Sequence, residues 1–130
     1  MAFEDDDKNL ESRAPSAEDL VVLCKSLNEN NVKYIVVGGM AMINAGFSRA
    51  TVDIDLLVDA SNENIKKIKE ALNYLPDNAI SEIEVSDVED YTVVRVADEI
   101  MIDLMKSACG VTYEEASGLI KKVKINHVCK

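Results

Sequence analysis

Basic residues and tryptophan are scarce in this sequence of 130 residues. Lys and Arg number 14 against 24 Asp and Glu, so the formal net charge is -10, and there is no Trp. A surface of that sign repels nucleic acid, because polyanion binding depends on Lys and Arg that neutralise phosphates. The small number of aromatic side chains, 5% of the sequence, also argues against a base-stacking platform. We therefore discount a free DNA- or RNA-binding module and expect any phosphate-bearing ligand to need metal ions or a local basic patch.

Metal-binding cysteine and histidine patterns and long apolar runs are missing too. Cys24, Cys109 and Cys129 lack C-x-x-C spacing, and His127 is the one histidine, so neither a disulfide framework nor a zinc site is indicated. No apolar run approaches the length of a membrane span, and the N-terminus is acidic where a signal peptide would be basic and then apolar. These absences predict a cytoplasmic protein that has no membrane partner.

What the sequence does contain suits one packed domain. Hydrophobic residues make up 48% of the chain, and its length allows one core but not two. Residues 1–15 are polar, charged and aperiodic, which predicts a flexible leader. Residues 16–130 are expected to form the folded domain.

Periodicity and capping signals predict an alternation of helices and strands. The expected elements are a helix over 16–30, a strand over 33–37, a short helix over 40–45, a strand over 51–59, a helix from Ser61 to Pro76, strands over 91–96 and 100–105 around a turn at 97–99, a short helix opened by Thr112, and a strand at 123–125. Residues 87–90 are expected to be a solvated loop. This order predicts an α/β or α+β fold with a mixed sheet flanked by helices on one face or both.

Two aspartates stand out in the strand over 51–59. Asp53 and Asp55 are two residues apart and therefore share one face of the strand, while Ile54, Leu56 and Val58 share the core face. Carboxylates spaced in this way lie about 7 Å apart along the backbone, close enough for both to reach one cation. Magnesium takes oxygen ligands and bridges readily to substrate phosphates, so the pair is a natural half-site.

A third carboxylate and a glycine pair complete the constellation. Asp103 is expected on the outward face of the strand over 100–105, and three clustered carboxylates repel one another unless cations are present. Gly38 and Gly39 follow the strand over 33–37 and leave room for a triphosphate close to the backbone. A glycine pair after a strand is most often only a tight turn, so its weight comes from the aspartates.

The segment from Gly38-Gly39 to Arg49-Ala-Thr-Val-Asp-Ile-Asp-Leu56, followed by Asp103 on a later strand, resembles the nucleotidyltransferase superfamily that includes DNA polymerase β. It is especially similar to minimal and abortive-infection-type members. The resemblance implies the nucleotidyltransferase fold and transfer of a nucleoside monophosphate from a nucleoside triphosphate, with Mg²⁺ or Mn²⁺ as cofactor.

The resemblance also implies roles for individual residues. Asp53 and Asp55 would bind the metal ions, and Asp103 would complete the catalytic site. Gly38 and Gly39 would contact phosphates. Many members have Gly-Ser in place of Gly-Gly, so Ser48 or Arg49 would have to supply the missing phosphate contact.

The acceptor and the partners stay open at this stage. The acceptor hydroxyl could belong to RNA, a protein or a small molecule, and the negative charge disfavours long RNA. Larger relatives carry an additional helical part, so either a homodimer or a toxin–antitoxin-type protein partner completes the site, or the sequence is a fragment of a longer protein. The alternative is a non-catalytic module of the same fold that binds nucleotide or a protein partner.

Overall fold

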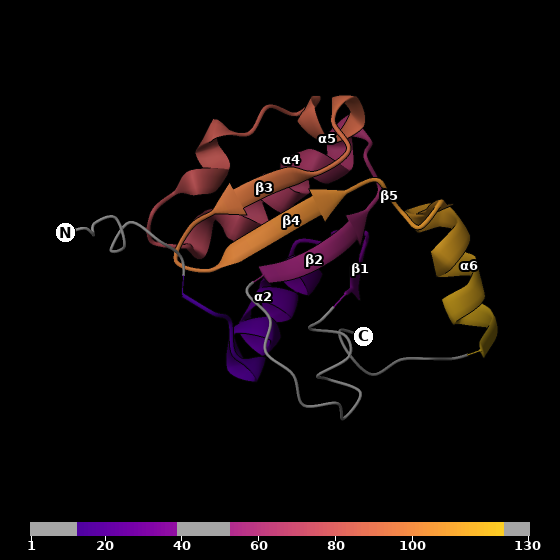
Figure 1. Ribbon diagram of the computed structural model, residues 1–130, viewed down its shortest axis with the longest axis horizontal. Coiled ribbons are helices and arrows are strands. Elements are labelled where there is room, and N and C mark those ends of the chain that lie inside the picture. The colour runs from indigo at the N-terminus through magenta and orange to yellow at the C-terminus, as the bar shows by residue number, and fades with distance from the viewer. Residues whose placement is uncertain (1–12, 39–52, 124–130) are drawn as a thin grey trace.

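A four-stranded mixed sheet organises the residues that the computed structural model describes, 13–38 and 53–123 (Figure 1). The strand order is β1-β2-β4-β3. Strand β2 pairs antiparallel with β1 and parallel with β4, and β4 pairs antiparallel with β3. The bounds are Tyr34–Val37 for β1, Asp53–Val58 for β2, Val94–Ala97 for β3 and Met101–Met105 for β4. The mixed sheet and the helices confirm the predicted α+β class.

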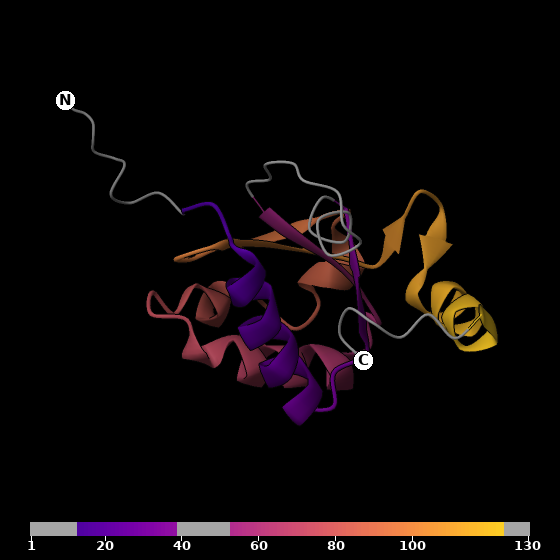
Figure 2. The ribbon, with the colours of Figure 1, turned by 90° about the horizontal axis from the view of Figure 1, so that it is seen from below.

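Two helices cover one face of this sheet (Figure 2). Helix α2, Ala17–Glu29, begins at the predicted capping box, in which Asp19 N–H donates to the Ser16 hydroxyl. Helix α4, Asn62–Ala71, begins after Ser61, whose hydroxyl accepts from Asn64 N–H. Three short helical turns follow, at Leu72–Tyr74, at Ala79–Glu82 and in α5 at Asp87–Asp90.

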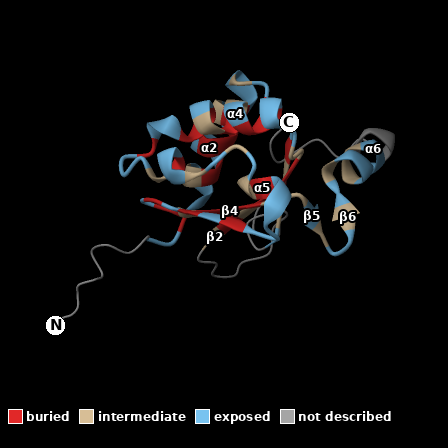
Figure 3. Ribbon diagram, turned by 90° about the horizontal axis from the view of Figure 1, so that it is seen from above, coloured by how far each residue is buried: buried red, intermediate tan, exposed pale blue. Residues whose placement is uncertain are grey.

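The core lies between these helices and the sheet (Figure 3). Ile54, Leu56 and Val58 of β2 are at most 1% exposed and belong to one cluster with the buried faces of α2 and α4. Each fully buried side chain of this size stabilises the fold by roughly 1.5–3 kcal/mol. Because side chains alternate along a strand, this packing turns Asp53 and Asp55 to the opposite face.

The outward direction of the aspartates had suggested an exposed face, but this opposite face is not uniformly exposed. Leu57 shares the parity of the two aspartates, yet it is 2% exposed. The face that carries Asp53 and Asp55 therefore combines polar and buried apolar positions.

The C-terminal part contains a hairpin that the sequence did not predict. Strands β5, Ser107–Ala108, and β6, Val111–Thr112, pair antiparallel around Cys109 and Gly110. Both turn residues have positive φ, 54° and 80°, as tight hairpin turns require. Helix α6, Tyr113–Val123, then begins with the predicted Thr112–Glu115 capping box and lies to the side of the sheet (Figure 1).

Several predicted boundaries were wrong. The strand expected over 91–96 begins at Val94, the expected loop over 87–90 is the short helix α5 around buried Val88, and Val123 ends α6 and does not start a strand. Cys109 is exposed and free. The helix expected over 40–45 lies outside the described residues.

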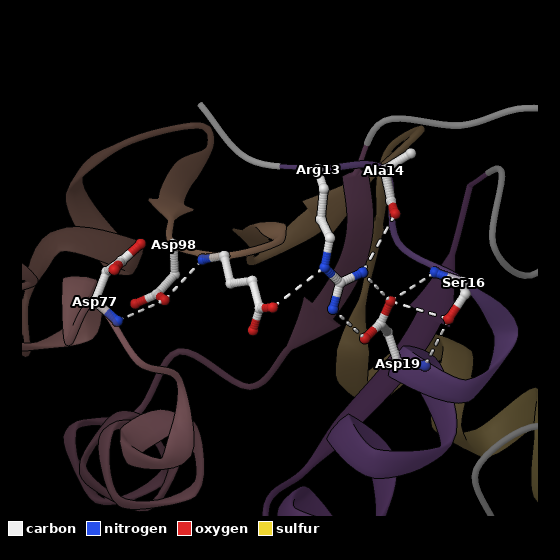
Figure 4. A network of polar contacts seen from close by, with 7 residues as sticks. Arg13, Ala14, Ser16, Asp19, Asp77 and Asp98 are labelled. Carbon is white, nitrogen blue, oxygen red and sulfur yellow. Dashed lines mark hydrogen bonds and ion pairs between the residues drawn. The ribbon is translucent and has the colours of Figure 1, made fainter. Parts of the chain in front are cut away.

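Residues 13–15 of the predicted leader are tied to the domain by Arg13 (Figure 4). Its guanidinium forms two hydrogen bonds to Asp19, at 2.6 and 2.8 Å, and one to Glu99, at 3.2 Å. The neighbouring Asp98 is 3% exposed and accepts backbone N–H groups of Asp77, Ala79 and Glu99. This network joins the start of α2 to the β3–β4 turn. Among the described residues, no helix has the length and apolarity that a membrane span needs.

Candidate active site

Three carboxylates converge on the two central strands of the sheet. Asp55 of β2 is the direct partner of Asp103 in the parallel pairing of β2 with β4, and Asp53 lies one step along the same face. One oxygen of each of the three lies within 4.8 Å of the others. The sheet register thus brings together the three acids that the sequence singled out, from positions 50 residues apart.

This arrangement is electrostatically unfavourable in the absence of cations. Like charges directly opposite each other on neighbouring strands destabilise a sheet, and Asp103 is only 5% exposed. Burial raises the pKa of Asp55 to about 6, and the charges of Asp53 and Asp103 act in the same direction. Burial and the charge of Asp103 also raise the pKa of Asp53. Perturbed carboxylates of this kind concentrate at functional sites.

An arginine that the sequence analysis did not single out partly offsets this repulsion. Arg95 of β3 is the direct cross-strand partner of Asp103. Its Nε donates to Asp103 Oδ1 at 2.8 Å, and its Nη2 donates to Asp103 Oδ2 at 2.9 Å and to Asp53 Oδ2 at 3.2 Å. The two carboxylates raise the pKa of Arg95 further above its already high usual value. The signal in the sequence that could have indicated Arg95 was its position as a charged residue between Val94 and Val96 of an otherwise apolar strand.

Gly38 lies against Asp55 at the end of β1. Val37 is the register partner of Asp55, and Gly38 follows with a φ of +77°. A Cβ atom at Gly38 would overlap Asp55 Oδ2 and lie 3.2 Å from Asp55 Cγ. The glycine therefore leaves the space that the Asp55 carboxylate occupies, and its contact with phosphate stays a prediction.

Other predicted site residues lie outside the described part of the chain. Gly39, Ser48 and Arg49 are among them, so their assignment to substrate binding stays a prediction. Lys106, which follows Asp103 closely in sequence, donates to the Glu89 backbone carbonyl at 2.6 Å.

A hollow of about 440 Å³ lies away from the carboxylates, beyond the last residues of β2 and β4. It is lined by Val58, Asp59, Ala60, Glu89, Lys106, Ser107, Thr112, Tyr113 and Glu114. None of the three converging aspartates contributes to it. The carboxylate cluster therefore lies on the sheet face and not in this hollow.

The mixed sheet, its helical layer and the three convergent aspartates are consistent with a nucleotidyltransferase fold. The chain belongs to a family described as nucleotidyltransferase of unknown function (DUF6036), whose profile matches residues 18–104. The matched region runs from α2 to β4 and includes all three aspartates and Arg95. No curated protein matches the chain, and no solved structure matches it.

The donor set suits a hard divalent cation. The cluster offers only carboxylate oxygens, which are ligands for Mg²⁺ and Mn²⁺, and no cysteine or histidine is among them. Arg95 supplies one positive charge against three carboxylates. A divalent ion would remove the remaining repulsion, so the described residues fit a magnesium or manganese site.

The raised pKa of Asp55 predicts how the metal-free protein responds to pH. The folded state holds the Asp55 proton up to about pH 6, whereas the unfolded chain releases it near pH 4. The folded state therefore binds more protons between these values, and the free energy of unfolding should fall as pH rises from about 4 to 6. Asp55→Asn should remove this loss and stabilise the protein at pH 7 by roughly 1 kcal/mol, after allowance for solvent screening.

Urea unfolding of the protein in EDTA at a series of pH values measures this effect. Asp90→Asn is the matched control, because Asp90 is exposed at the end of α5 and lies outside the carboxylate cluster. It corrects for the loss of one negative charge from an acidic protein. If Asp55→Asn and Asp90→Asn change the free energy of unfolding equally at pH 7, the raised pKa of Asp55 is contradicted.

Proposed function

We propose that this protein is a metal-dependent nucleotidyltransferase that transfers a nucleoside monophosphate from a nucleoside triphosphate to a hydroxyl acceptor. Membership of a nucleotidyltransferase family supports the reaction class. The observation that carries the proposal is the pairing of Asp55 with Asp103 on adjacent central strands, with Asp53 beside them. A sheet keeps directly opposed like charges at a cost, and this cost is explained when the charges hold cations for a reaction.

The described residues supply the parts that such a transfer needs. Asp53, Asp55 and Asp103 project from rigid central strands, so their oxygens are fixed relative to one another before substrate binds. Metal ions held there would neutralise the triphosphate and stabilise the charge on the attacking and leaving oxygens. The acceptor oxygen then bonds to the α-phosphorus as the bond to the β-phosphate oxygen breaks, and pyrophosphate leaves. Asp103 would complete the site and help to activate the acceptor hydroxyl.

The acceptor and the partners remain part of the proposal. RNA, a protein hydroxyl and a small molecule all supply the required nucleophile, and the net charge of -10 disfavours long RNA. A toxin–antitoxin-type partner or a second copy of the chain would add acceptor-binding surface beside the sheet.

A second candidate function is favoured by the position of Arg95. Its guanidinium occupies oxygens of Asp103 and Asp53, as it would in a module that keeps the fold without catalysis. Metal binding separates the two candidates, because the enzyme must admit divalent ions to these carboxylates and the non-catalytic module need not.

Incubation with labelled nucleoside triphosphates and Mg²⁺ or Mn²⁺ tests the proposal. The four ribonucleotides, each labelled at the α-phosphate, are supplied with the protein alone, with RNA, with candidate protein partners and with hydroxyl-bearing small molecules. We expect labelled acceptor and an equal amount of pyrophosphate from at least one combination. Label transfer that persists equally in Asp53→Asn/Asp55→Asn would assign the activity to a contaminant.

Divalent metal is expected to raise the melting temperature of the protein. A ligand that binds only the folded state stabilises it by about 2.7 kcal/mol at a hundredfold excess over Kd. Differential scanning fluorimetry with MgCl₂ and MnCl₂ measures the shift, and CaCl₂ tests the preference for small cations. The proposed metal site predicts that Asp53→Asn/Asp55→Asn abolishes the shift, and an identical shift in that variant would exclude these ligands.

A further inference from the structure

Arg95 holds two members of the carboxylate cluster through one planar guanidinium. It engages both oxygens of Asp103, through Nε and Nη2, and Nη2 also reaches Asp53. Arginine is suited to this geometry because its donors form a rigid fork that matches a carboxylate. Both oxygens of Asp103 and one oxygen of Asp53 are therefore already bound to a cation.

The charges around the cluster show why this state cannot accept a triphosphate. Three carboxylates and one guanidinium leave two net negative charges on this face of the sheet. Two other described basic residues are engaged elsewhere, Arg13 with Asp19 and Glu99, and Lys106 with Glu89. A triphosphate would be repelled until divalent cations reverse the sign of the local charge.

We infer that Arg95 is an exchangeable counter-ion, which holds Asp53 and Asp103 in the metal-free protein and moves to the triphosphate when divalent metal binds. The inference rests on the proposed function and adds a residue that positions the substrate. Metal ion and guanidinium repel each other and compete for the same carboxylate oxygens, so both cannot be bound there at full strength. A guanidinium that is released beside the site has a phosphate as its next available partner, with the same fork geometry.

The position of Arg95 permits this movement. It lies on β3, an edge strand of the sheet, and 53% of its side chain is exposed, whereas the Asp103 side chain is 7% exposed. The flexible partner of the pair is therefore the arginine, and the carboxylate stays fixed. Metal binding and nucleotide binding become coupled, since the first releases the group that favours the second.

Titration calorimetry with MnCl₂ and with α,β-methylene ATP tests the exchange without any turnover. Without nucleotide, Arg95→Gln should bind Mn²⁺ about tenfold more tightly than the unaltered protein, because the competing cation is gone. At saturating Mn²⁺ the same variant should bind α,β-methylene ATP about tenfold more weakly, because a phosphate ligand is gone. A purely structural role would weaken both affinities together, so opposite shifts identify the exchange.

Arg13→Gln is the matched control, because it also removes an arginine that bonds two carboxylates, and it lies outside the cluster. We expect it to change neither affinity. Arg95→Lys keeps the positive charge without the forked guanidinium, so both affinities should be intermediate between those of the unaltered protein and Arg95→Gln. If circular dichroism shows that Arg95→Gln is unfolded, Arg95→Lys decides the outcome.

The result that overturns the exchange is Mn²⁺ affinity in folded Arg95 variants that equals or falls below that of the unaltered protein. Asp53→Asn/Asp55→Asn sets the baseline for Mn²⁺ binding at the cluster. If that variant binds Mn²⁺ as well as the unaltered protein, the metal site fails, and the proposed function and the exchange fall together. If binding depends on the aspartates while Arg95→Gln has no effect, only the exchange is overturned.

Discussion

Asp→Asn replacement at position 53, 55 or 103 is expected to lower the rate of nucleotidyl transfer by at least about 10²-fold while the domain stays folded. The three carboxylates lie within 4.8 Å of one another, so each is a neighbour of any ion held by the other two. Losing one ligand displaces the cations from the line between the attacking and leaving oxygens. Asparagine keeps the size of the side chain, so the loss reports charge and coordination and not packing.

Stability should move in the opposite direction from activity. Neutralising Asp55 relieves repulsion that the metal-free fold otherwise carries, and we expect unchanged or higher resistance to urea in EDTA. For Asp53→Asn and Asp103→Asn this gain is offset by the loss of an ion pair with Arg95. Single-turnover rates with labelled triphosphate and unfolding curves, both including the exposed control Asp90→Asn, measure the two effects. Full activity in Asp103→Asn, or unfolding of every single variant, would show that these residues serve the structure instead.

The sequence predicted the carboxylate cluster because its signals were local. The spacing of Asp53 and Asp55 fixes their common face in any strand, and the apolar neighbours of Asp103 fix its direction in the same way. The capping boxes at Ser16 and Thr112 likewise predicted the starts of α2 and α6, since a cap needs only side chains within one turn. Family resemblance added the expectation that the strands with these acids would be neighbours.

Strand register could not be predicted with the same accuracy, and this concealed Arg95. A turn at 97–99 would have placed Val96 opposite Ile100 and Arg95 opposite Met101. The observed hairpin pairs Ala97 with Met101 and so brings Arg95 opposite Asp103. Buried Asp98, which accepts backbone N–H groups of Glu99 in the turn and of the distant residues Asp77 and Ala79, helps to fix this register. Such contacts join distant segments and leave no periodic signal in the sequence.

The burial of Leu57 and the role of Gly38 were also beyond the sequence signals. Because side chains alternate along a strand, Leu57 shares the face of Asp53 and Asp55, but its 2% exposure depends on tertiary packing. Gly38 was interpreted as a phosphate contact because glycine pairs after strands leave the backbone accessible. The close approach of Asp55 gives a second reason for glycine, and it comes from the antiparallel pairing of β1 with β2.

Gly38→Ala is therefore expected to reduce both activity and stability. Its φ of +77° is unfavourable for alanine, and the new methyl group would overlap the Asp55 carboxylate. The left-handed conformation costs roughly 1–2 kcal/mol in any side-chain-bearing residue. Displacement of Asp55 by the methyl group adds to this cost and should lower the transfer rate by about 10²-fold, as misplacement of a catalytic group by about 1 Å does.

Gly110→Ala separates the two causes, because Gly110 has a φ of +80° and no atom within 4 Å of an added Cβ. It should lose only the roughly 1–2 kcal/mol of backbone strain and keep full activity. In an Asp55→Ala background, Gly38→Ala should cost no more than Gly110→Ala does, since the two atoms that it would meet most closely, Asp55 Oδ2 and Cγ, are gone. Urea unfolding of the double-mutant cycle and transfer rates of the single variants measure these terms.

Equal stability losses for Gly38→Ala and Gly110→Ala, together with full transfer activity of Gly38→Ala, would show that the position of Asp55 does not depend on the glycine. If Gly38→Ala costs more stability than Gly110→Ala and this excess disappears with Asp55, the glycine is identified as the residue that makes room for this carboxylate.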